Sequence, residues 1–275
     1  MSWPTDVMSS PADHKHIAEP RGPLWVQRSR TVTRIVLDRP DKRNALSHDL
    51  LDALLAALDA CAADQEARVV VLAAEGPAFC AGHDLREIAA STPAEIESLF
   101  ALCARVMLRL QEIPQPVIAS VHGIATAAGC QLVAACDLAI AAEEATFATP
   151  GVNIGLFCST PAVPVVRSIG RKRAMEMLLT GDGIDARTAL EWGLVNRVVA
   201  ARDLDAAVDA LAEKIASVSA DTVALGKRAF YRQIGHDERE AYEIASAVMC
   251  ENAASPDARE GIAAFLAKRR ATWRR

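Results

Sequence analysis

The sequence is poor in several features by which classes of protein are recognised. Aromatic residues make up only 4% of its 275 residues, so the core must consist mostly of Ala, Val, Leu and Ile. No apolar run reaches the roughly 18 residues that a membrane-spanning helix requires. Residues 1–22 lack the charged start and apolar stretch of a signal peptide, and they carry few positive charges for a transit peptide. We therefore expect a flexible tail over residues 1–22 and a cytoplasmic protein.

Several catalytic and ligand-binding motifs are also missing. The sequence contains no P-loop, no GxSxG, no HExxH and no GxGxxG, which excludes the common NTPase, α/β-hydrolase, zincin and Rossmann classes. Its seven cysteines form no CxxC pair and its six histidines show no metal-ligand spacing, so we expect reduced thiols and no metal. A formal net charge of −5 argues against nucleic acid or an anionic membrane as the main partner.

Hydrophobic residues make up 51% of the chain, which is enough for a large core. Apolar and polar residues alternate over 25–40, as in a β-hairpin, and Ser47 is placed to cap a helix over 49–64. A continuous apolar run at 68–75 is typical of a strand buried on both faces. The alternation continues with a helix at 93–112, a strand at 116–123, a helix at 127–135 and a strand at 137–142. This order predicts an α/β fold with parallel strands.

The pattern changes after about residue 160. We predict helices at 173–181 and 185–193 and a short strand at 194–199, followed only by helices, at 203–217, 220–234, 237–254 and 256–270. Such a helical stretch is too elongated to bury itself, so it should pack on the core or on another subunit. We therefore divide the chain into the tail at 1–22, a core at 23–202 and a helical C-terminal region at 203–275.

Two segments have the composition of ligand-binding turns: FCAGHDL at 79–85 and HGIATAAGC at 122–130. Gly82 permits unusual backbone geometry, and the small residues after Thr126 open a helix whose first N–H groups have no partner within the helix. Two N–H donors from separate turns, aimed at one carbonyl oxygen, would stabilise an enolate or a tetrahedral oxyanion. The alternative for 79–85 is an ordinary strand-to-helix loop in which glycine makes the turn, and the alternative for 122–130 is close packing of a helix on a strand.

Both segments, together with LDRPDKRNALS (37–47), LLTGDGIDARTALEWGLVNRVV (178–199) and FLAKRRATW (265–273), resemble the crotonase (enoyl-CoA hydratase/isomerase) superfamily. The resemblance covers roughly residues 24–272. It implies a spiral of ββα units with a helical C-terminal oligomerisation region, in trimers or dimers of trimers. It also implies an acyl-CoA ligand, with coenzyme A as part of the substrate and no other cofactor.

The resemblance assigns roles to individual positions. The backbone N–H groups of His83 and Ala128 would form the oxyanion hole. The contacts to CoA would come from an N-terminal loop, from the first oxyanion loop and from the C-terminal Phe-x-x-Lys, which often belongs to a neighbouring subunit; these residues are Lys42, Arg43, Ala81, His83, Asp84, Leu85, Phe265 and Lys268.

The sequence departs from the family at its two catalytic carboxylates. Enoyl-CoA hydratases carry glutamates at the positions that Gln131 and Gly151 occupy here. Hydration needs an acid and a base, each of which typically contributes about 10²–10⁴-fold to the rate. Neither glutamine nor glycine exchanges protons at neutral pH, which argues against a hydratase of ordinary efficiency.

Two functions remain open from the sequence. One is an enzyme of the enoyl-CoA hydratase/isomerase type in fatty-acid metabolism, whether a lyase, an isomerase or a decarboxylase. The other is a non-catalytic acyl-CoA-binding or assembly protein that has lost hydratase chemistry. The sequence itself resembles the enoyl-CoA hydratase domain-containing subgroup, which lacks both catalytic glutamates. The His83 imidazole could face the acyl group or solvent, and Cys158 is more simply explained as an inert buried thiol than as a nucleophile.

Overall fold

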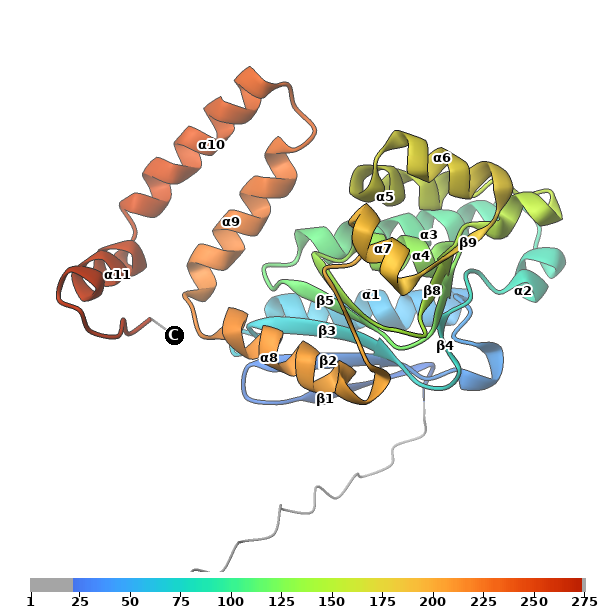
Figure 1. Cartoon of the computed structure of the whole chain (residues 1–275), viewed down its shortest axis with the longest axis horizontal. Helices are drawn as coiled ribbons and strands as arrows, with labels where there is room; N and C mark the ends of the chain where they lie inside the picture. Colours follow the sequence, from blue (N-terminus) through green and yellow to red (C-terminus); the bar gives the residue numbers. More distant parts are fainter. Residues whose placement is uncertain (1–21, 274–275) are drawn as a thin grey trace, which may run out of the picture.

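The computed structural model describes residues 22–273, so the tail predicted at 1–22 lies almost wholly outside the described residues. Two sheets form the body (Figure 1). The larger has the order β1-β2-β3-β5-β7-β10 and the smaller the order β4-β6-β8-β9. The strands of the larger sheet are β1 Leu24–Arg28, β2 Val32–Leu37, β3 Val69–Ala74, β5 Val117–Val121, β7 Leu138–Ala142 and β10 Arg197–Val199. The strands of the smaller sheet are β4 Ala78–Cys80, β6 Ile124–Thr126, β8 Thr146–Ala148 and β9 Gly183–Asp185.

The chain moves from one sheet to the other in repeated turns. β3, β5 and β7 lie parallel in the large sheet, and each is followed at once by its partner β4, β6 or β8 in the small sheet. The helices are α1 His48–Ala63, α2 Leu85–Ala90, α3 Pro93–Glu112, α4 Ala128–Ala135, α5 Ser159–Ile169, α6 Arg171–Thr180, α7 Ala186–Trp192, α8 Leu204–Ala216, α9 Ala220–Gln233, α10 Glu238–Ala253 and α11 Pro256–Leu266. Short 3₁₀ helices of three to five residues lie at Pro40–Lys42, Pro150–Ile154 and Ala201–Asp203. This arrangement is the spiral of ββα units that the resemblance predicts.

The large sheet is buried on both faces. Val70 and Leu72 of β3 face the main core beneath α1 and α3, whereas Val69 and Val71 face the cluster that α8 completes. Burying a large apolar side chain stabilises the fold by about 1.5–3 kcal/mol. When both faces of a strand are buried, apolar residues are favoured at every position, and the alternation of apolar and polar residues is lost. The continuous apolar run at 68–75 is explained in this way.

Local signals set the helix boundaries. The Ser47 hydroxyl accepts a hydrogen bond from the Leu50 N–H at the start of α1, as predicted. Thr92 and Glu95 form a capping box at the start of α3, which satisfies two N–H groups reciprocally. α7 begins after Asp185 and ends at Gly193, also as predicted. α5 was not predicted; Pro164 lies inside it, and proline disfavours a helix interior.

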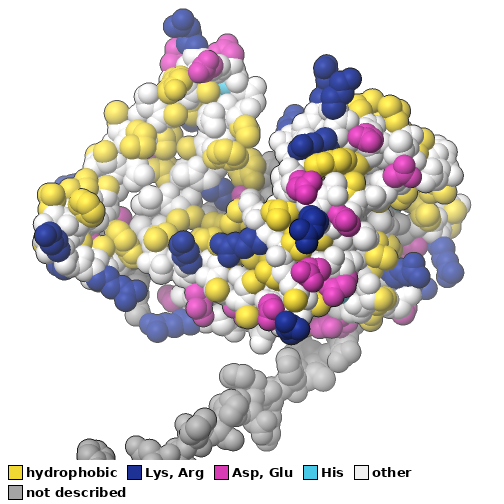
Figure 2. Space-filling view, in the orientation of Figure 1, with side chains coloured by type: hydrophobic (Ala, Val, Ile, Leu, Met, Phe, Trp, Pro, Cys, Tyr) yellow, Lys and Arg dark blue, Asp and Glu magenta, His cyan; other side chains and the backbone are white. Residues whose placement is uncertain are grey.

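The helices α9, α10 and α11 form an arm that projects from the body on the side opposite α2 (Figure 1). No whole residue of α9 or α10 is buried, although the side chain of Lys227 is only 6% exposed. Large apolar side chains lie exposed along the arm, and Figure 2 shows such side chains gathered over it; they include Phe230, Tyr242, Met249, Ile262, Phe265 and Leu266. The arm therefore does not bury its own apolar surface within one chain.

A buried ion pair fixes the base of the arm. The Lys227 ammonium on α9 donates to the Asp137 carboxylate at 2.7 Å and to the backbone carbonyls of Leu110 and Gln115. The Tyr231 hydroxyl donates to the other Asp137 oxygen at 2.9 Å. Burial lowers the Lys227 pKa, and the neighbouring carboxylate opposes this shift. Asp137 thus joins the arm to the start of β7.

Candidate acyl-binding site

The first turn of the site follows β4. Gly82 has φ of 93°, a conformation that only glycine adopts without strain. Its carbonyl accepts the Leu46 N–H at 2.7 Å, and the Asp84 N–H donates to the Leu46 carbonyl at 3.0 Å. These two bonds bracket His83 and hold its backbone in an extended bridge with Leu46. Within residues 22–273, the His83 N–H has no hydrogen-bond acceptor.

The second turn leads from β6 into α4. Ala127 has φ of 50° and ψ of −117°, a rare conformation for a residue with a side chain. Its N–H donates to the Ala148 carbonyl at 2.9 Å, which fixes the turn against β8. Ala128 is then the first residue of α4, and its N–H finds no acceptor in the described part of the chain. A free N–H at a helix start attracts negative charge.

The two turns meet at one cavity of about 560 Å³. Its lining is mainly apolar and comes from both turns, from α2 and α3, and from the segment 150–161; it consists of Ala81, His83, Leu85, Ile88, Phe100, Thr126, Ala127, Ala128, Pro150, Gly151, Asn153, Ile154, Leu156, Phe157, Cys158, Ser159, Thr160 and Pro161. A concave apolar site with a few backbone donors is the usual form of a small-molecule site. The predicted pair His83 and Ala128 is therefore brought together.

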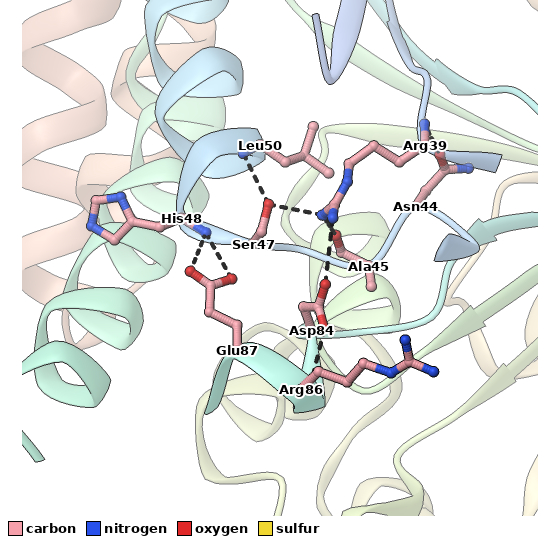
Figure 3. Close-up of polar contacts among 9 residues, drawn as sticks. All are labelled: Arg39, Asn44, Ala45, Ser47, His48, Leu50, Asp84, Arg86 and Glu87. Atoms are coloured by element: carbon pink, nitrogen blue, oxygen red, sulfur yellow. Dashed lines mark hydrogen bonds and ion pairs between the residues drawn. The ribbon is translucent and has the colours of Figure 1, made fainter. Parts of the chain in front are cut away.

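The predicted N-terminal CoA loop lies beside the first turn. The Ala81 N–H donates to the Arg43 carbonyl at 3.0 Å, and the Lys42 and Arg43 side chains are exposed. Figure 3 shows how Arg39 holds this loop: its guanidinium donates to the Ser47 hydroxyl at 2.8 Å and pairs with Asp84 at 3.4 Å. These contacts join the two loops through side chains.

Asp84 has a structural task within this network (Figure 3). One carboxylate oxygen pairs with Arg39, and the other accepts the Arg86 N–H as the N-cap of α2. Glu87 accepts the His48 N–H and so ties α2 to α1. Of the predicted CoA-contacting residues, Asp84 therefore contributes to loop geometry, whereas Lys42 and Arg43 carry exposed cationic side chains beside the site.

The position of one expected glutamate is physically closed. Gly151 lines the cavity, but a Cβ placed there would overlap the Leu156 carbonyl and lie 2.8 Å from the Cys158 sulfur. The segment after Gly155 has thus folded into the space that a side chain at 151 would occupy. A glutamate side chain at position 151 would fit only if residues 156–158 moved.

Gln131, at the other glutamate position, lies on α4 and is not among the residues that line the cavity. Its side chain is buried, and its Oε1 has no hydrogen-bond partner among the described residues. A carboxylate in this place would be desolvated, which raises its pKa, and glutamine avoids that charge. The structure therefore places Gly151, but not Gln131, in contact with the cavity.

The His83 side chain is half-buried and lines the cavity, where its ring meets the Phe100 ring edge-on at a centroid distance of 4.9 Å. Its Nε2 is buried and has no hydrogen-bond partner in residues 22–273. Burial lowers the His83 pKa to about 4, so the ring is neutral at physiological pH. Burial also raises the Cys158 pKa, which keeps that thiol protonated and favours the inert alternative.

The two C-terminal residues expected to contact CoA lie elsewhere in the chain. Phe265 is on α11 and is 83% exposed, and Lys268 follows that helix with φ of 51°. α11 lies at the far end of the arm from α2, which borders the cavity (Figure 1). The structure of one chain does not bring these two residues to the site.

Several cavity residues were not anticipated from the sequence. Ile88, Phe100 and Thr126 line it, as do Leu156 and Phe157, which are about half exposed at its edge. In the sequence, Leu156 and Phe157 stand out only as two apolar residues next to Gly155. Over residues 22–273, no cluster of three or more His, Cys, Asp or Glu could hold a metal ion, and no helix is long and apolar enough to cross a membrane.

Comparison with known proteins supports the resemblance. The family model described as enoyl-CoA hydratase/isomerase matches residues 27–275. A mouse protein named enoyl-CoA hydratase domain-containing protein 3, mitochondrial, is 46% identical over 243 residues, which is 88% of this chain and 81% of that protein. The human protein of the same name is 45% identical over 257 residues, covering 93% and 84% of the two chains.

These relatives correct one expectation. Both are named as mitochondrial proteins, which contradicts our expectation of a cytoplasmic protein. The expectation rested on the composition of residues 1–22. Targeting segments are read by import receptors and are not part of the fold, so composition and fold do not determine the compartment.

Solved structures agree with the fold. A structure titled enoyl-CoA hydratase from Mycobacterium smegmatis superimposes with a TM-score of 0.90 at 51% identity, covering 92% of this chain and 99% of that one. The human enoyl-CoA hydratase domain-containing protein 3 superimposes with a TM-score of 0.89 at 44% identity, covering 91% and 100%. The predicted crotonase fold is thereby confirmed, and the chain belongs to the enoyl-CoA hydratase/isomerase family.

Proposed function

We propose that the protein binds an acyl-CoA thioester in the cavity and polarises its carbonyl with the N–H groups of His83 and Ala128. The observation that carries the proposal is that one apolar cavity is lined by two residues from separate turns whose N–H groups have no acceptor within residues 22–273. A thioester oxygen placed between them would complete both hydrogen bonds. Donors fixed in advance in a water-poor site are the largest single contribution to catalysis in many acyl-transfer enzymes.

The acyl group in this proposal is aliphatic. Leu85, Ile88, Phe100, Ile154 and Phe157 offer an apolar wall, and no charged side chain lines the cavity in the described part of the chain. An aliphatic chain gains about 0.8 kcal/mol for each methylene that it buries. Such a substrate belongs to fatty-acid metabolism, with CoA entering as part of the substrate and no further cofactor.

The CoA portion would lie outside the cavity, along the loop that holds Ala81, Asp84 and Leu85. Lys42 and Arg43 are the exposed cations beside this loop and would meet the phosphates. In this proposal the protein is a homo-oligomer, a trimer or a dimer of trimers. The exposed apolar side chains of the arm support this assembly, in which Phe265 and Lys268 of a neighbouring subunit would complete the CoA site.

Ordinary hydration is not part of the proposed function. The segment at 156–158 occupies the space of a side chain at Gly151, and Gln131 does not reach the cavity. Two proton-transfer groups of a hydratase are therefore missing from the places where the family keeps them. The reaction, if it is that of a lyase or an isomerase, must use another group.

Affinity for a series of saturated acyl-CoA thioesters tests the proposal. We expect the dissociation constant to fall about fourfold for each added methylene from acetyl- to hexanoyl-CoA, because each buries about 0.8 kcal/mol of apolar surface. Isothermal titration calorimetry measures the dissociation constant of each thioester. Phe157→Ser should flatten this dependence, whereas Leu179→Ser, an exposed residue of α6 outside the cavity, should not. Affinity equal to that of free CoA, whatever the chain length, would contradict the proposal.

A further inference from the structure

The loop that holds the His83 backbone is bent in an unusual way. Arg43 and Asn44 have φ of 51° and 53°, so two consecutive residues with side chains adopt the left-handed conformation. This conformation is unfavourable for residues other than glycine, although asparagine tolerates it better than most. Such strain persists only where the surrounding structure imposes it. The bend at Arg43 and Asn44 must therefore be held by contacts of the folded chain.

Asn44 supplies such contacts with its own side chain. The residue is completely buried, and its Oδ1 accepts the Arg39 N–H at 2.8 Å (Figure 3). Its Nδ2 donates to the backbone carbonyls of Glu75 and Ala78, each at 2.8 Å. Both polar atoms of the Asn44 side chain thus bond to backbone, and they fix the loop to the turn between β3 and β4.

The bend is connected to His83 through the next two residues. The Ala45 carbonyl accepts a hydrogen bond from the Arg39 guanidinium at 2.7 Å. Leu46 then forms the two backbone hydrogen bonds, of 2.7 and 3.0 Å, that bracket His83. The direction of the His83 N–H therefore depends on the position of Leu46, and the position of Leu46 depends on the bend at Asn44.

Direction matters for a backbone donor. A hydrogen bond weakens steeply when the angle at its hydrogen falls below about 120°, so a small rotation of the His83 peptide is enough to lose it. The other donor, Ala128, is fixed separately, because it begins α4 and follows a turn that Ala127 ties to β8. A loosened loop at 43–46 would therefore impair the His83 donor and leave the Ala128 donor in place.

We propose that Asn44 is the positioning residue of the His83 oxyanion donor. This inference rests on the proposed function. Asn44 is not among the residues that line the cavity, so it acts only through the backbone. Its three side-chain hydrogen bonds hold the bend, the bend places Leu46, and Leu46 aims the His83 N–H at the thioester oxygen.

The affinities for butyryl-CoA and for S-butyl-CoA, a thioether in which a methylene replaces the carbonyl, test the inference. Both ligands require the same folded protein and the same CoA contacts, so the ratio of their dissociation constants reports the contacts to the carbonyl oxygen. One hydrogen bond typically contributes about fivefold in affinity, so two donors should give the wild type a preference of about 25-fold for butyryl-CoA. Isothermal titration calorimetry measures both constants.

Asn44→Gly is the decisive variant, because glycine keeps the left-handed backbone without strain and removes all three side-chain bonds. We expect its preference for butyryl-CoA to fall to about fivefold, the contribution of Ala128 alone. A purely structural role would lower the free energy of unfolding and leave the preference of the folded protein unchanged. An unchanged preference in Asn44→Gly therefore overturns the inference.

Asn196→Gly is the matched control. The Asn196 side chain also holds backbone, since its Oδ1 accepts the Ala139 N–H at 2.8 Å, but it belongs to the junction of β7 and β10. This variant should keep the wild-type preference, and an equal loss in it and in Asn44→Gly overturns the inference.

Arg39→Met decides in the same way if Asn44→Gly does not fold. It removes the bond to the Ala45 carbonyl, and the Arg39 side chain is 22% exposed, so the core stays intact. A lowered preference in this variant supports the inference, and an unchanged one overturns it. A wild-type protein without any preference for butyryl-CoA contradicts the proposed function itself, whereas an unchanged preference in the variants leaves the proposed function standing.

Discussion

We expect Gly129→Ala to destabilise the protein by about 3 kcal/mol or more and to abolish acyl-CoA binding. A Cβ at position 129 would overlap the carbonyl oxygen of Cys80 and lie 2.9 Å from the Cys80 Cβ. Overpacked cores usually cost about 1–3 kcal/mol, and this clash is with backbone, which cannot turn aside. α4 must therefore move away from β4.

The functional consequence follows from the same displacement. Ala128 precedes Gly129 at the start of α4, and His83 belongs to the turn that follows β4. If α4 moves, the two N–H donors no longer point at one oxygen. Urea denaturation and calorimetry with butyryl-CoA measure the two effects.

The matched control is Gly226→Ala in α9, where a Cβ would meet no atom within 4 Å. Alanine in a helix interior is favoured over glycine by about 1 kcal/mol, so this variant should be neutral or slightly more stable. Equal free energies of unfolding for Gly129→Ala and Gly226→Ala would contradict the close approach of α4 to β4.

The second large effect on stability is expected when the Lys227–Asp137 ion pair at the base of the arm is broken. We expect Lys227→Met to lower the free energy of unfolding by about 3–5 kcal/mol, because it leaves the Asp137 carboxylate without its buried cation. The side chains of Lys227 and Asp137 are only 6% and 14% exposed, so little water reaches the carboxylate after the ammonium is lost. Urea denaturation followed by circular dichroism measures this change.

A double variant separates the pair from its surroundings. Lys227→Met with Asp137→Asn should be less destabilised than the sum of the two single variants, because no unpaired charge remains buried. Lys214→Ala, an exposed lysine of α8, should change stability by less than about 0.5 kcal/mol. Strict additivity of the two substitutions would show that Lys227 and Asp137 do not act as a pair.

Much of the fold could be predicted from the sequence, since its long elements carry strong local signals. The buried run of β3 and the capped helices α1 and α7 were placed to within one or two residues. The small sheet was not placed from the pattern: β4, β6, β8 and β9 have three residues each, too few to show a period. Their existence was implied only by the resemblance.

The site was predicted in part. Because the donors of the oxyanion hole are backbone groups in glycine-containing turns, spacing and small residues were enough to locate His83 and Ala128. The packing of residues 156–158 against Gly151 is a tertiary contact, which no local pattern reveals. The same holds for the unpartnered Nε2 of His83 and for the distance between α11 and the cavity.

Infrared spectroscopy of bound [1-¹³C]butyryl-CoA tests the central claim most directly. If the His83 and Ala128 N–H groups polarise the thioester carbonyl, its stretching band must shift to lower wavenumber on binding, because hydrogen bonds to the oxygen weaken the C=O bond. The same band should shift in His83→Phe, which keeps both backbone donors. A bound thioester whose carbonyl band stays at its position in water would contradict the account.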